Sequence, residues 1–388
     1  MAFLFTEEEQ LLQQSAREFL EQEVMPALAE QMKKGKPFDI ALGLWPKLAE
    51  QGFIGIATPE SMGGLGMGVK TECAMMEILG VGASLGTNID AHNLLLNAIV
   101  YNGSDYQKEK YGIPAAKGEI MCAAAVTDPA GSMNFPEWSF SVREEEDGYV
   151  LNGTKVFCSN SQGADLYGVF ANDYENGYPM GCYLVEAGTP GLTFGEIEEL
   201  CKNGENTGTV YFSECKIPKE NKMPSGDFAN AGWLSLGYLD CAAVLCGCAR
   251  FCLEKTKAYV KTRTRNGKPL YKLQAVAHRI VNMEMELELA RAMMYSAAEL
   301  WDAGKPDLKL HSYAKIAASE AFSKIAHDCT IMHGAYGFAP ETGLIGLHTF
   351  APAGHVGECP NDFHRDLIAG LLGLPQDSWL GDPVKKVK

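Results

Sequence analysis

Apolar side chains recur every three or four positions along the first 120 residues, which is the spacing of helices that bury one face. The first stripe follows Thr6 and Glu9, which stand at the spacing of a capping box. We therefore predict an α-helical domain over residues 1–120. The stripe consists of Leu11, Leu12, Ala16, Phe19 and Leu20, and further helices are predicted at 42–51, 70–79 and 88–103, with Gly103 as a C-terminal stop.

Between residues 121 and 225 the apolar period changes to two, which is the period of half-buried strands. Two dipeptides, Asp147-Gly148 and Asn152-Gly153, are typical of tight hairpin turns. The pattern therefore predicts an antiparallel β domain over residues 121–225. Its predicted strands span 138–144, 149–151, 154–158, 166–171, 181–185, 192–198 and 209–217.

Long helices return in residues 226–388, where the spacing predicts them at 240–264, 271–303 and 311–333, with Gly304 and Gly334 as stops. The order of these regions predicts an α+β fold with an N-terminal helical domain, a middle antiparallel β domain and a C-terminal helical bundle. Charged residues along the second long helix indicate a solvated or subunit-facing surface; they are Arg279, Glu284, Glu286, Glu288 and Arg291.

Charge excludes one class of partner. The 388 residues include 49 acidic and 33 basic side chains, a formal net charge of −16, which would repel a phosphate backbone. We therefore expect no nucleic-acid partner. The longest apolar segment, 233–251, is interrupted by Asp240 and Arg250, so no membrane-spanning helix is predicted.

The twelve cysteines include no CxxC pair. Four of them, at positions 241, 246, 248 and 252, fall in one apolar helical segment, which indicates buried reduced thiols rather than disulfides or a metal site. The N-terminus lacks the basic start and the apolar stretch of a signal peptide. Both observations favour a cytoplasmic protein.

Four segments combine residue types that can carry chemistry. Residues 127–132 (Thr-Asp-Pro-Ala-Gly-Ser) place two hydroxyl groups around a glycine and could hold a polar heterocycle; the alternative is an ordinary turn. Residues 155–160 (Lys-Val-Phe-Cys-Ser-Asn) put an aromatic ring two positions before a hydroxyl group. Residues 263–270 form a basic loop that could clamp a pyrophosphate; the alternative is a solvated connection between helices.

The fourth segment, 353–360, holds a single carboxylate, Glu358, among small and apolar neighbours just before the last helix. Burial raises the pKa of a carboxyl group and so its strength as a base, which suits proton abstraction beside a carbonyl. The alternative is a glutamate that stands at the entry of a helix.

In this order the segments resemble those of the acyl-CoA dehydrogenase family along nearly the whole chain. Residues 127–132 look like its Thr-Glu-Pro-x-Ala-Gly-Ser motif, 157–160 like its Trp-Ile-Thr-Asn strand, and 334–338 (Gly-Ala-Tyr-Gly-Phe) like its glycine-rich segment over the adenosine diphosphate. The resemblance implies FAD as the cofactor, held partly by a neighbouring subunit. The matching positions are Val126, Thr127, Ser132, Phe157, Ser159, Arg263, Gln274, Gly334 and Gly337.

The resemblance also implies a catalytic base. Counted without a gap from Gly337, Glu358 falls on the glutamate of the family's Glu-Gly-Thr motif. Ser132 falls beside the flavin and the thioester, and Tyr238 replaces an arginine in a segment that many members use near CoA and the acyl group. Cys359-Pro360 replaces the family's Gly-Thr. Because these changes cluster on the substrate side, they favour a non-linear acyl group.

Asp90, counted back from Gly103, falls where family members line the far end of the acyl pocket. One explanation is structural, because a carboxylate in the first turn of a helix is stabilised by the helix dipole. The other is functional, because some relatives use an aspartate in this region for 1,4-elimination on alicyclic carboxyl-CoA thioesters. Asp90 is therefore both a substrate-binding and a catalytic candidate.

We predict a FAD-dependent acyl-CoA dehydrogenase in which Glu358 removes an α proton while a β hydride leaves an alicyclic or otherwise bulky acyl group. Three alternatives stay open: 1,4-dehydrogenation of a cyclohexene-carboxyl-CoA-type substrate with Asp90 as the base, a non-catalytic relative that binds CoA or flavin, and a flavin oxidase of the same fold. The resemblance further implies an electron-transfer flavoprotein as the electron acceptor and a homotetramer. No metal is expected.

Overall fold

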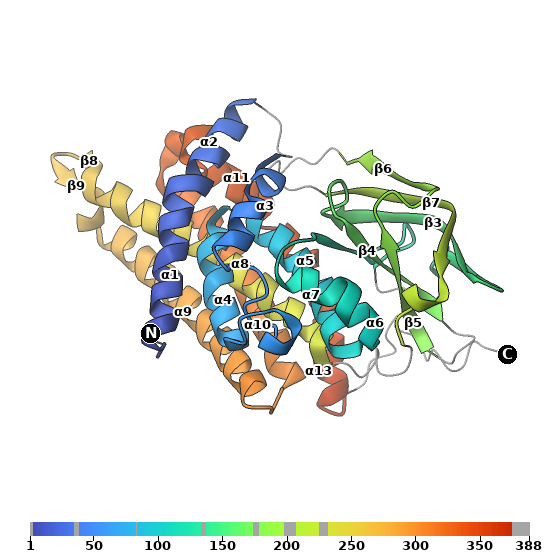
Figure 1. Cartoon of the computed structure of the whole chain (residues 1–388). Coiled ribbons are helices and arrows are strands. Elements are labelled where there is room, and N and C mark those ends of the chain that lie inside the picture. The colour runs from blue at the N-terminus through green and yellow to red at the C-terminus, as the bar shows by residue number, and fades with distance from the viewer. Residues whose placement is uncertain are drawn as a thin grey trace.

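The computed structural model describes residues 3–34, 39–82, 84–132, 137–173, 178–197, 207–224 and 232–374. Helices come first, strands follow and helices return, which confirms the predicted α+β order. Figure 1 shows the two helical regions packed together, with the strands of the middle region on one side of them. The predicted domain boundary between residues 225 and 226 lies outside the described residues.

The N-terminal region is a layer of helices that begins with the predicted capping box. The Thr6 hydroxyl accepts a hydrogen bond from the Glu9 amide at 3.2 Å, and the Glu9 carboxylate accepts one from the Thr6 amide at 2.6 Å. The helices are α1 (Glu7–Phe19), α2 (Met25–Lys34), α3 (Asp39–Glu50), α4 (Gly68–Leu79), α5 (Ser84–Asn102), α6 (Asp105–Gln107) and α7 (Ile113–Ala116), with short turns at η1 (Leu20–Val24), η2 (Glu60–Met62), η3 (Gly80–Gly82) and η4 (Lys108–Gly112).

The described part of the middle region holds two sheets, with strand orders β1-β4-β5 and β2-β3-β7-β6. One pair corrects the prediction of a purely antiparallel domain, because β1 and β4 run parallel, with Cys122 opposite Leu166. The strands are β1 (Cys122–Ala125), β2 (Ser141–Glu145), β3 (Gly148–Ser159), β4 (Leu166–Asp173), β5 (Tyr178–Glu186), β6 (Leu192–Glu196) and β7 (Thr207–Pro218).

The three-stranded sheet is buried on both of its faces. One face packs on the four-stranded sheet, and the other packs on α5, where a Cβ atom added to Gly168 would lie 2.3 Å from Leu95 Cδ1. Strands covered on both sides read as continuous apolar runs without alternation. The sequence of β1 is Cys-Ala-Ala-Ala, which explains why the period-two pattern did not predict it as a strand.

One of the two predicted hairpin turns is confirmed and the other is wrong. Asp147 lies in the turn that joins β2 to β3, as predicted. Asn152-Gly153 instead lies inside β3, where the pairing with β7 shifts and forms a bulge. Gly153 has φ +139°, a conformation that residues with a Cβ rarely adopt, so glycine permits the bulge here. The predicted strands 149–151 and 154–158 are therefore one strand.

The C-terminal region confirms the three predicted long helices to within a few residues, and Gly304 and Gly334 follow two of them with left-handed backbones. A two-stranded arm connects the first two helices. The elements are η8 (Gly232–Ser235), α8 (Leu236–Thr262), β8 (Thr264–Arg265), β9 (Lys268–Pro269), η9 (Leu270–Lys272), α9 (Gln274–Asp302), α10 (Leu308–Met332), η10 (Gly334–Phe338), η11 (Pro340–Thr342), α11 (Leu344–Phe350), α12 (Ala353–Val356) and α13 (Asn361–Leu371).

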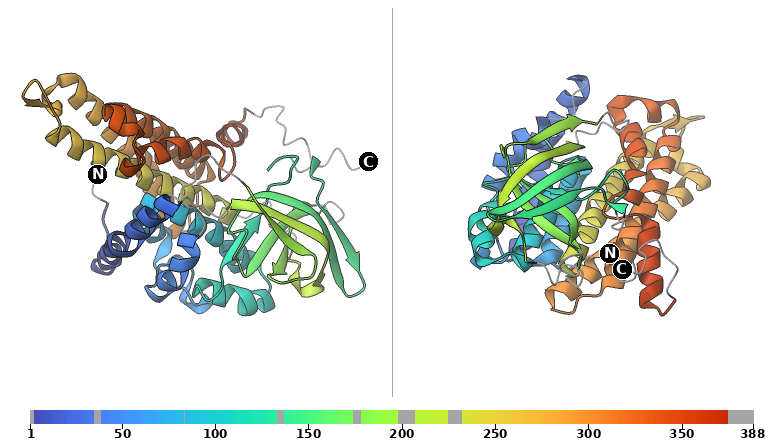
Figure 2. Two further views of the ribbon diagram at one scale, coloured as in Figure 1. Left: turned by 90° about the horizontal axis from the view of Figure 1, so that it is seen from above. Right: turned by 90° about the vertical axis from the view of Figure 1, so that its right-hand side faces the viewer.

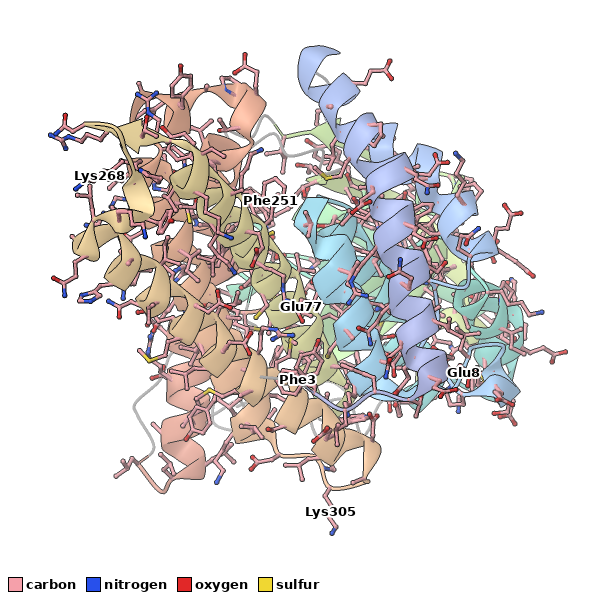
Figure 3. The ribbon with its side chains drawn as sticks, turned by 90° about the vertical axis from the view of Figure 1, so that its left-hand side faces the viewer. Phe3, Glu8, Glu77, Phe251, Lys268 and Lys305 are labelled. Atoms are coloured by element: carbon pink, nitrogen blue, oxygen red, sulfur yellow. The ribbon has the colours of Figure 1, made fainter. Side chains whose placement is uncertain are left out.

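Arg291 of α9 is an exception to the predicted solvated or subunit-facing surface. Its side chain is buried, and its Nε atom donates a hydrogen bond to the Glu77 carboxylate of α4 at 2.7 Å. The Tyr295 hydroxyl donates to the same carboxylate at 2.6 Å. Figure 3 labels Glu77 between the N-terminal and C-terminal helices. Arg291, which we predicted to lie on the surface, therefore forms a buried ion pair that joins α9 to α4.

Helix α8 runs through the centre of the molecule between α4, α5, α9 and α10. Small residues permit this close approach: a Cβ atom on Gly247 would lie 2.2 Å from the Glu77 carbonyl oxygen, and one on Gly80 would lie 2.7 Å from Val244 Cα. The segment Gly232–Thr262 has the length and hydropathy of a membrane-crossing helix, but 89% of its most apolar window is buried inside the protein.

Gly247→Ala is expected to destabilise the protein, because the added methyl group would meet the α4 backbone. Overpacking of this kind typically lowers the free energy of unfolding by about 1–3 kcal/mol. Gly370→Ala is the matched control, since Gly370 lies in α13 and none of the described residues has an atom within 4 Å of an added Cβ there. That control is expected to stabilise by about 0.5–1 kcal/mol through helix propensity. Urea unfolding measures both, and equal midpoints would contradict the close-approach argument.

Candidate active site

The two segments that resemble flavin-binding motifs lie side by side at the ends of two strands. Thr127 follows β1, and its carbonyl oxygen accepts a hydrogen bond from the Val156 amide of β3 at 2.9 Å. The pairing of β3 with β7 slips between Lys155 and Cys158, and Phe157 takes φ +52° in this bulge. The Phe157 ring is thereby turned outward and is 63% exposed. Ser132 and Ser159 are both partly exposed.

Asn160 connects this strand end to helix α5. Its side-chain amide donates hydrogen bonds to the carbonyl oxygens of Asn88 and Cys122, both at 2.9 Å, and its side-chain oxygen accepts one from the Asn88 amide at 2.5 Å. Asn160 is buried and also has a left-handed backbone. Because Asn88 precedes Asp90 by two residues on α5, these bonds fix the part of α5 that carries Asp90 against the end of β3.

The predicted base, Glu358, lies in the loop between α12 and α13, as expected. Glu358 and Cys359 both have left-handed backbones, with φ +47° and +71°. Such conformations cost residues with a Cβ of order 1–3 kcal/mol each. Two buried side chains hold the loop in this shape: His364 Nε2 donates to the Glu358 carbonyl oxygen at 2.9 Å, and Lys315 Nζ donates to the Cys359 carbonyl oxygen at 2.7 Å.

The carboxyl group of Glu358 lies against helix α8. An added Cβ atom on Gly237 would lie 2.6 Å from Glu358 Oε2, so a larger residue at position 237 would displace the carboxylate from this place. Burial raises the pKa of Glu358 to about 7, although the nearby Lys315 ammonium acts in the opposite direction. A carboxyl group with a pKa near neutrality is half ionised at pH 7 and is matched to general-base work.

His364 is held in one neutral tautomer. Burial lowers the pKa of His364 to about 4, and Lys315 adds to the shift. Because its Nε2 atom donates to the Glu358 carbonyl, its Nδ1 atom accepts from the Ser312 hydroxyl at 3.2 Å. The ring also meets Tyr238 edge to face at 4.5 Å.

Helices α5 and α8 meet in opposite directions along one seam. Leu94 lies 3.6 Å from a Cβ position on Gly237, the Asn93 amide donates to the Asp240 carboxylate at 3.0 Å, and Gly86 packs against Val244. The two helices are therefore antiparallel where they pack together.

Asp90 belongs to this seam, where its charge acts on Cys241. Asp90 lies one helical turn, about 6 Å along α5, from Leu94. Since Leu94 and Glu358 both lie beside Gly237, Asp90 is about one turn from Glu358 along this seam.

The structure removes the helix-dipole explanation for Asp90. The prediction placed Asp90 in the first turn of its helix, but α5 begins at Ser84, one turn earlier than expected. The dipole effect falls off within the first turn. Asp90 is buried, at 7% exposure, and so is Asp240. Burial, with the charges of Glu72 and Glu358, raises the pKa of Asp240 well above its usual range. Carboxyl groups therefore recur along the seam that faces Glu358.

Tyr238 is buried in α8 behind the loop of the base rather than on an open surface. Besides its contact with His364, it forms a side-chain hydrogen bond with Cys359. Both contacts support the Glu358 loop. A direct contact of Tyr238 with substrate stays a prediction.

The remaining cofactor candidates lie at the opposite end of the C-terminal bundle. Arg263 ends α8 and precedes the β8–β9 arm, Gln274 begins α9, and both are exposed. Tyr259 stacks on His333 at 4.2 Å, which brings this end of α8 beside Gly334 and the buried Gly337. Figures 1 and 2 show the arm at the end of the bundle away from the β sheets. Within a single chain, this second group of cofactor candidates therefore lies apart from the group that contains Thr127 and Phe157.

The first group fits the FAD that the sequence resemblance implies. Phe157 presents an exposed ring from a left-handed backbone, and strained conformations of this kind cluster at ligand-binding sites. Thr127 and Ser159 stand on the two segments that the Thr127–Val156 hydrogen bond joins, so both segments carry a hydroxyl-bearing residue. A flat apolar ring system with polar edges, such as the isoalloxazine, matches that arrangement.

Sequence reasoning missed the residues that support the base. Lys315 and His364 come from α10 and α13, and nothing in their local sequence marks a contact with Glu358. Gly237 reads as an ordinary glycine in an apolar helix. Of the residues that support the base, only Tyr238 was already a candidate from the sequence, and there it was predicted to lie near the substrate.

Three family models match nearly all of the chain. They are the acyl-CoA dehydrogenase N-terminal domain over residues 6–119, the middle domain over 123–215 and the C-terminal domain over 229–372.

Among curated relatives, the mitochondrial short-chain specific acyl-CoA dehydrogenase of Mus musculus is 33% identical over 374 residues, covering 94% of this chain and 90% of the relative. The butyryl-CoA dehydrogenase structure of Megasphaera elsdenii has a TM-score of 0.89 and 28% identity, with 96% of this chain and all of that chain covered.

Two further structures bear on the cofactor and the partner. One is titled an FAD complex of PigA, with 25% identity, a TM-score of 0.88 and coverage of 96% of this chain and all of that chain. The other accompanies work on the electron transferring flavoprotein of Acidaminococcus fermentans, with 29% identity, a TM-score of 0.88 and coverage of 96% and 99%. The fold, the flavin-like segments and the placed Glu358, together with these matches, show that this chain belongs to the acyl-CoA dehydrogenase family of FAD-binding oxidoreductases.

Proposed function

We propose that the protein oxidises an acyl-CoA thioester to the enoyl-CoA, with Glu358 as the base that removes the α proton. The observation that carries this proposal is the Glu358 carboxyl group, held against Gly237 with a pKa of about 7. A partly buried carboxylate of this kind is basic enough to take a proton activated by a neighbouring thioester carbonyl.

The residues of this chain position the reaction. FAD, when bound, supplies the acceptor for the hydride that leaves the β carbon. Lys315 and His364 hold the backbone of the Glu358 loop, so the carboxylate keeps one orientation. Gly237 leaves the space that the carboxylate needs beside α8. Such fixed placement supplies a large part of the rate enhancement, because the reacting groups need no reorientation.

A non-linear acyl group is the finer part of the proposal. Asp90 lies about one helical turn from the level of Glu358 along α5. The second candidate function follows from this placement: Asp90 takes the proton from a ring carbon of a cyclohexene-carboxyl-CoA-type substrate, and the hydride leaves from across the ring. The same seam also suits ordinary 1,2-dehydrogenation of a bulky acyl group with Glu358 alone.

We further propose a homotetramer in which one subunit completes the FAD site of another. Arg263 directly precedes the β8–β9 arm, which lies at the end of the bundle away from the β sheets, and this supports donation of the second group, Arg263, Gln274, Gly334 and Gly337, to a neighbour. Helix α9 also exposes apolar side chains every four residues, at 38–62% exposure, and such a stripe on a folded protein favours burial by a second copy. These residues are Val281, Met285, Leu289 and Met293.

For the electron acceptor we propose an electron-transfer flavoprotein, supported by the likeness to the chain solved with the Acidaminococcus fermentans work. We propose a cytoplasmic location, supported by eleven described cysteines that are all free thiols.

Glu358→Gln should bind substrate but leave its flavin oxidised. The amide keeps the shape of the carboxylate and cannot take the proton, so flavin reduction should slow by about 10²–10⁴-fold. Anaerobic stopped-flow mixing with straight, branched, aromatic and alicyclic acyl-CoA thioesters measures the loss of the visible band. Glu341→Gln, an exposed glutamate, is the control. If none of the thioesters reduces the flavin of the wild-type protein, the result would instead support the alternative of a non-catalytic relative that binds CoA or flavin.

The rate of flavin reduction should rise with pH through about 7 and level off above it, because Glu358 must be ionised to act. Lys315→Met removes an ammonium group that favours the carboxylate, so the midpoint should move to higher pH. Lys324→Met, an exposed lysine on the same helix, is the control and should leave the midpoint in place. A Lys315→Met midpoint at or below that of the wild type would argue against this coupling.

Asp90→Asn separates the two substrate proposals. If Asp90 is the base for a ring substrate, turnover of cyclohexene-carboxyl-CoA should fall about 10²–10⁴-fold while butyryl-CoA turnover changes little. Steady-state assays with both thioesters measure the ratio. Unchanged turnover of the cyclic substrate would return Asp90 to a structural role.

A further inference from the structure

Lys155 is a buried lysine in the middle of the β domain that the proposed chemistry does not use. It stands in β3 opposite Val210 of β7, with no exposed surface. Its Nζ atom donates a hydrogen bond to the Val126 carbonyl oxygen at 2.9 Å. The same atom lies 3.9 Å from the centre of the Trp138 ring and 5.1 Å from that of Phe140. The ammonium group is therefore enclosed by one carbonyl oxygen and two aromatic faces.

Burying this lysine is unfavourable in itself. Burial lowers the pKa of Lys155 to about 7, while the charge of Asp128 acts in the opposite direction. An apolar side chain would serve the packing of β3 at lower cost, since backbone bonds of the strand do not need the ammonium group. The position therefore indicates a task beyond holding the sheet together.

The contacts of Lys155 converge on residues 126–132, which we call the flavin segment. Lys155 holds the carbonyl group just before Thr127, and the Trp138 indole donates to the Gly131 carbonyl, just before Ser132, at 2.7 Å. The two hydroxyl-bearing residues of the segment are thus each preceded by a carbonyl group that is fixed from inside. Trp138 links the two anchors, because its ring also packs on Lys155.

Asp128 completes this arrangement from within the flavin segment. Its carboxylate accepts hydrogen bonds from the backbone amides of Ala130, Ser139 and Phe140 at 3.0–3.2 Å. These bonds close the segment into a turn and hold 139–140 beside it. Although burial acts the other way, the amide bonds and Lys155 lower the pKa of Asp128, so it stays ionised. Asp128 therefore closes the segment from inside while Lys155 holds the Val126 carbonyl group, and each of the two charges favours the other.

We propose that Lys155, acting through Trp138 and Asp128, is a positioning residue that sets the shape of the flavin segment and thereby the affinity for FAD. The proposal rests on FAD binding by the proposed enzyme and is independent of its acyl substrate. It assigns Lys155 no contact with the reacting atoms. Its effect reaches the flavin through the Val126 and Gly131 carbonyl groups, whose positions orient Thr127 and Ser132.

The test compares FAD binding by apoprotein variants. Lys155→Met keeps the length of the side chain and removes the ammonium group, so the Kd for FAD should rise about tenfold or more. Trp138→Phe keeps an aromatic ring over Lys155 but loses the bond to Gly131, so a rise of about three- to tenfold is expected. Quenching of flavin fluorescence measures Kd, and the visible absorption spectrum of the bound flavin should shift toward that of free FAD in both variants.

Lys216→Met is the matched control, because Lys216 lies exposed on β7 of the same domain and pairs with Glu145. It should leave both Kd and spectrum unchanged. Thermal unfolding of each apoprotein identifies the folded fraction, and Trp138→Phe decides the question if Lys155→Met does not fold. Folded variants that bind FAD with wild-type Kd and spectrum would overturn the proposal. A wild-type protein that takes up no FAD would instead contradict the proposed function.

Discussion

The close packing of helix α8 against α4 and α5 is the constraint on which the rest of the structure depends. Gly247 meets the backbone of α4, and Gly237 meets Leu94 of α5 and the carboxyl group of Glu358. One buried helix thus joins the two helical regions and forms the wall against which the base is placed. Larger side chains at these positions would separate the helices and displace the carboxylate in the same movement.

Buried charge is the second feature that organises the molecule. Three buried ionic groups lie where backbone conformation is unusual or where two regions meet: Lys315 beside the strained Glu358 loop, Lys155 against the flavin segment, and Glu77 between α4 and α9. Desolvating these groups is unfavourable, and their hydrogen bonds offset it only in one geometry. The buried charges therefore favour one conformation of each loop, although the backbone by itself would permit several conformations.

Much of the candidate site was predictable because its residues stand in short motifs whose local sequence carries the signal. Thr127, Phe157 and Glu358 were assigned because the segments around them resemble motifs of the acyl-CoA dehydrogenase family, and the small and apolar neighbours of Glu358 indicated a buried carboxyl group. Lys315, His364 and Gly237 could not, because each acts on a residue that lies far away along the chain. The first turn of α5 was also misplaced, and this changed the interpretation of Asp90.

The sequence by itself determined the order of helices and strands, the long C-terminal helices and the family, because periodicity and short motifs are local properties of the chain. Only the tertiary structure decided that β1 pairs parallel to β4, that Asn152-Gly153 is a bulge and that Arg291 is buried. It also decided that the β8–β9 arm lies at the far end of the helical bundle from strand β3. These features depend on which surfaces meet across large sequence separations, and no local pattern of side chains encodes that choice.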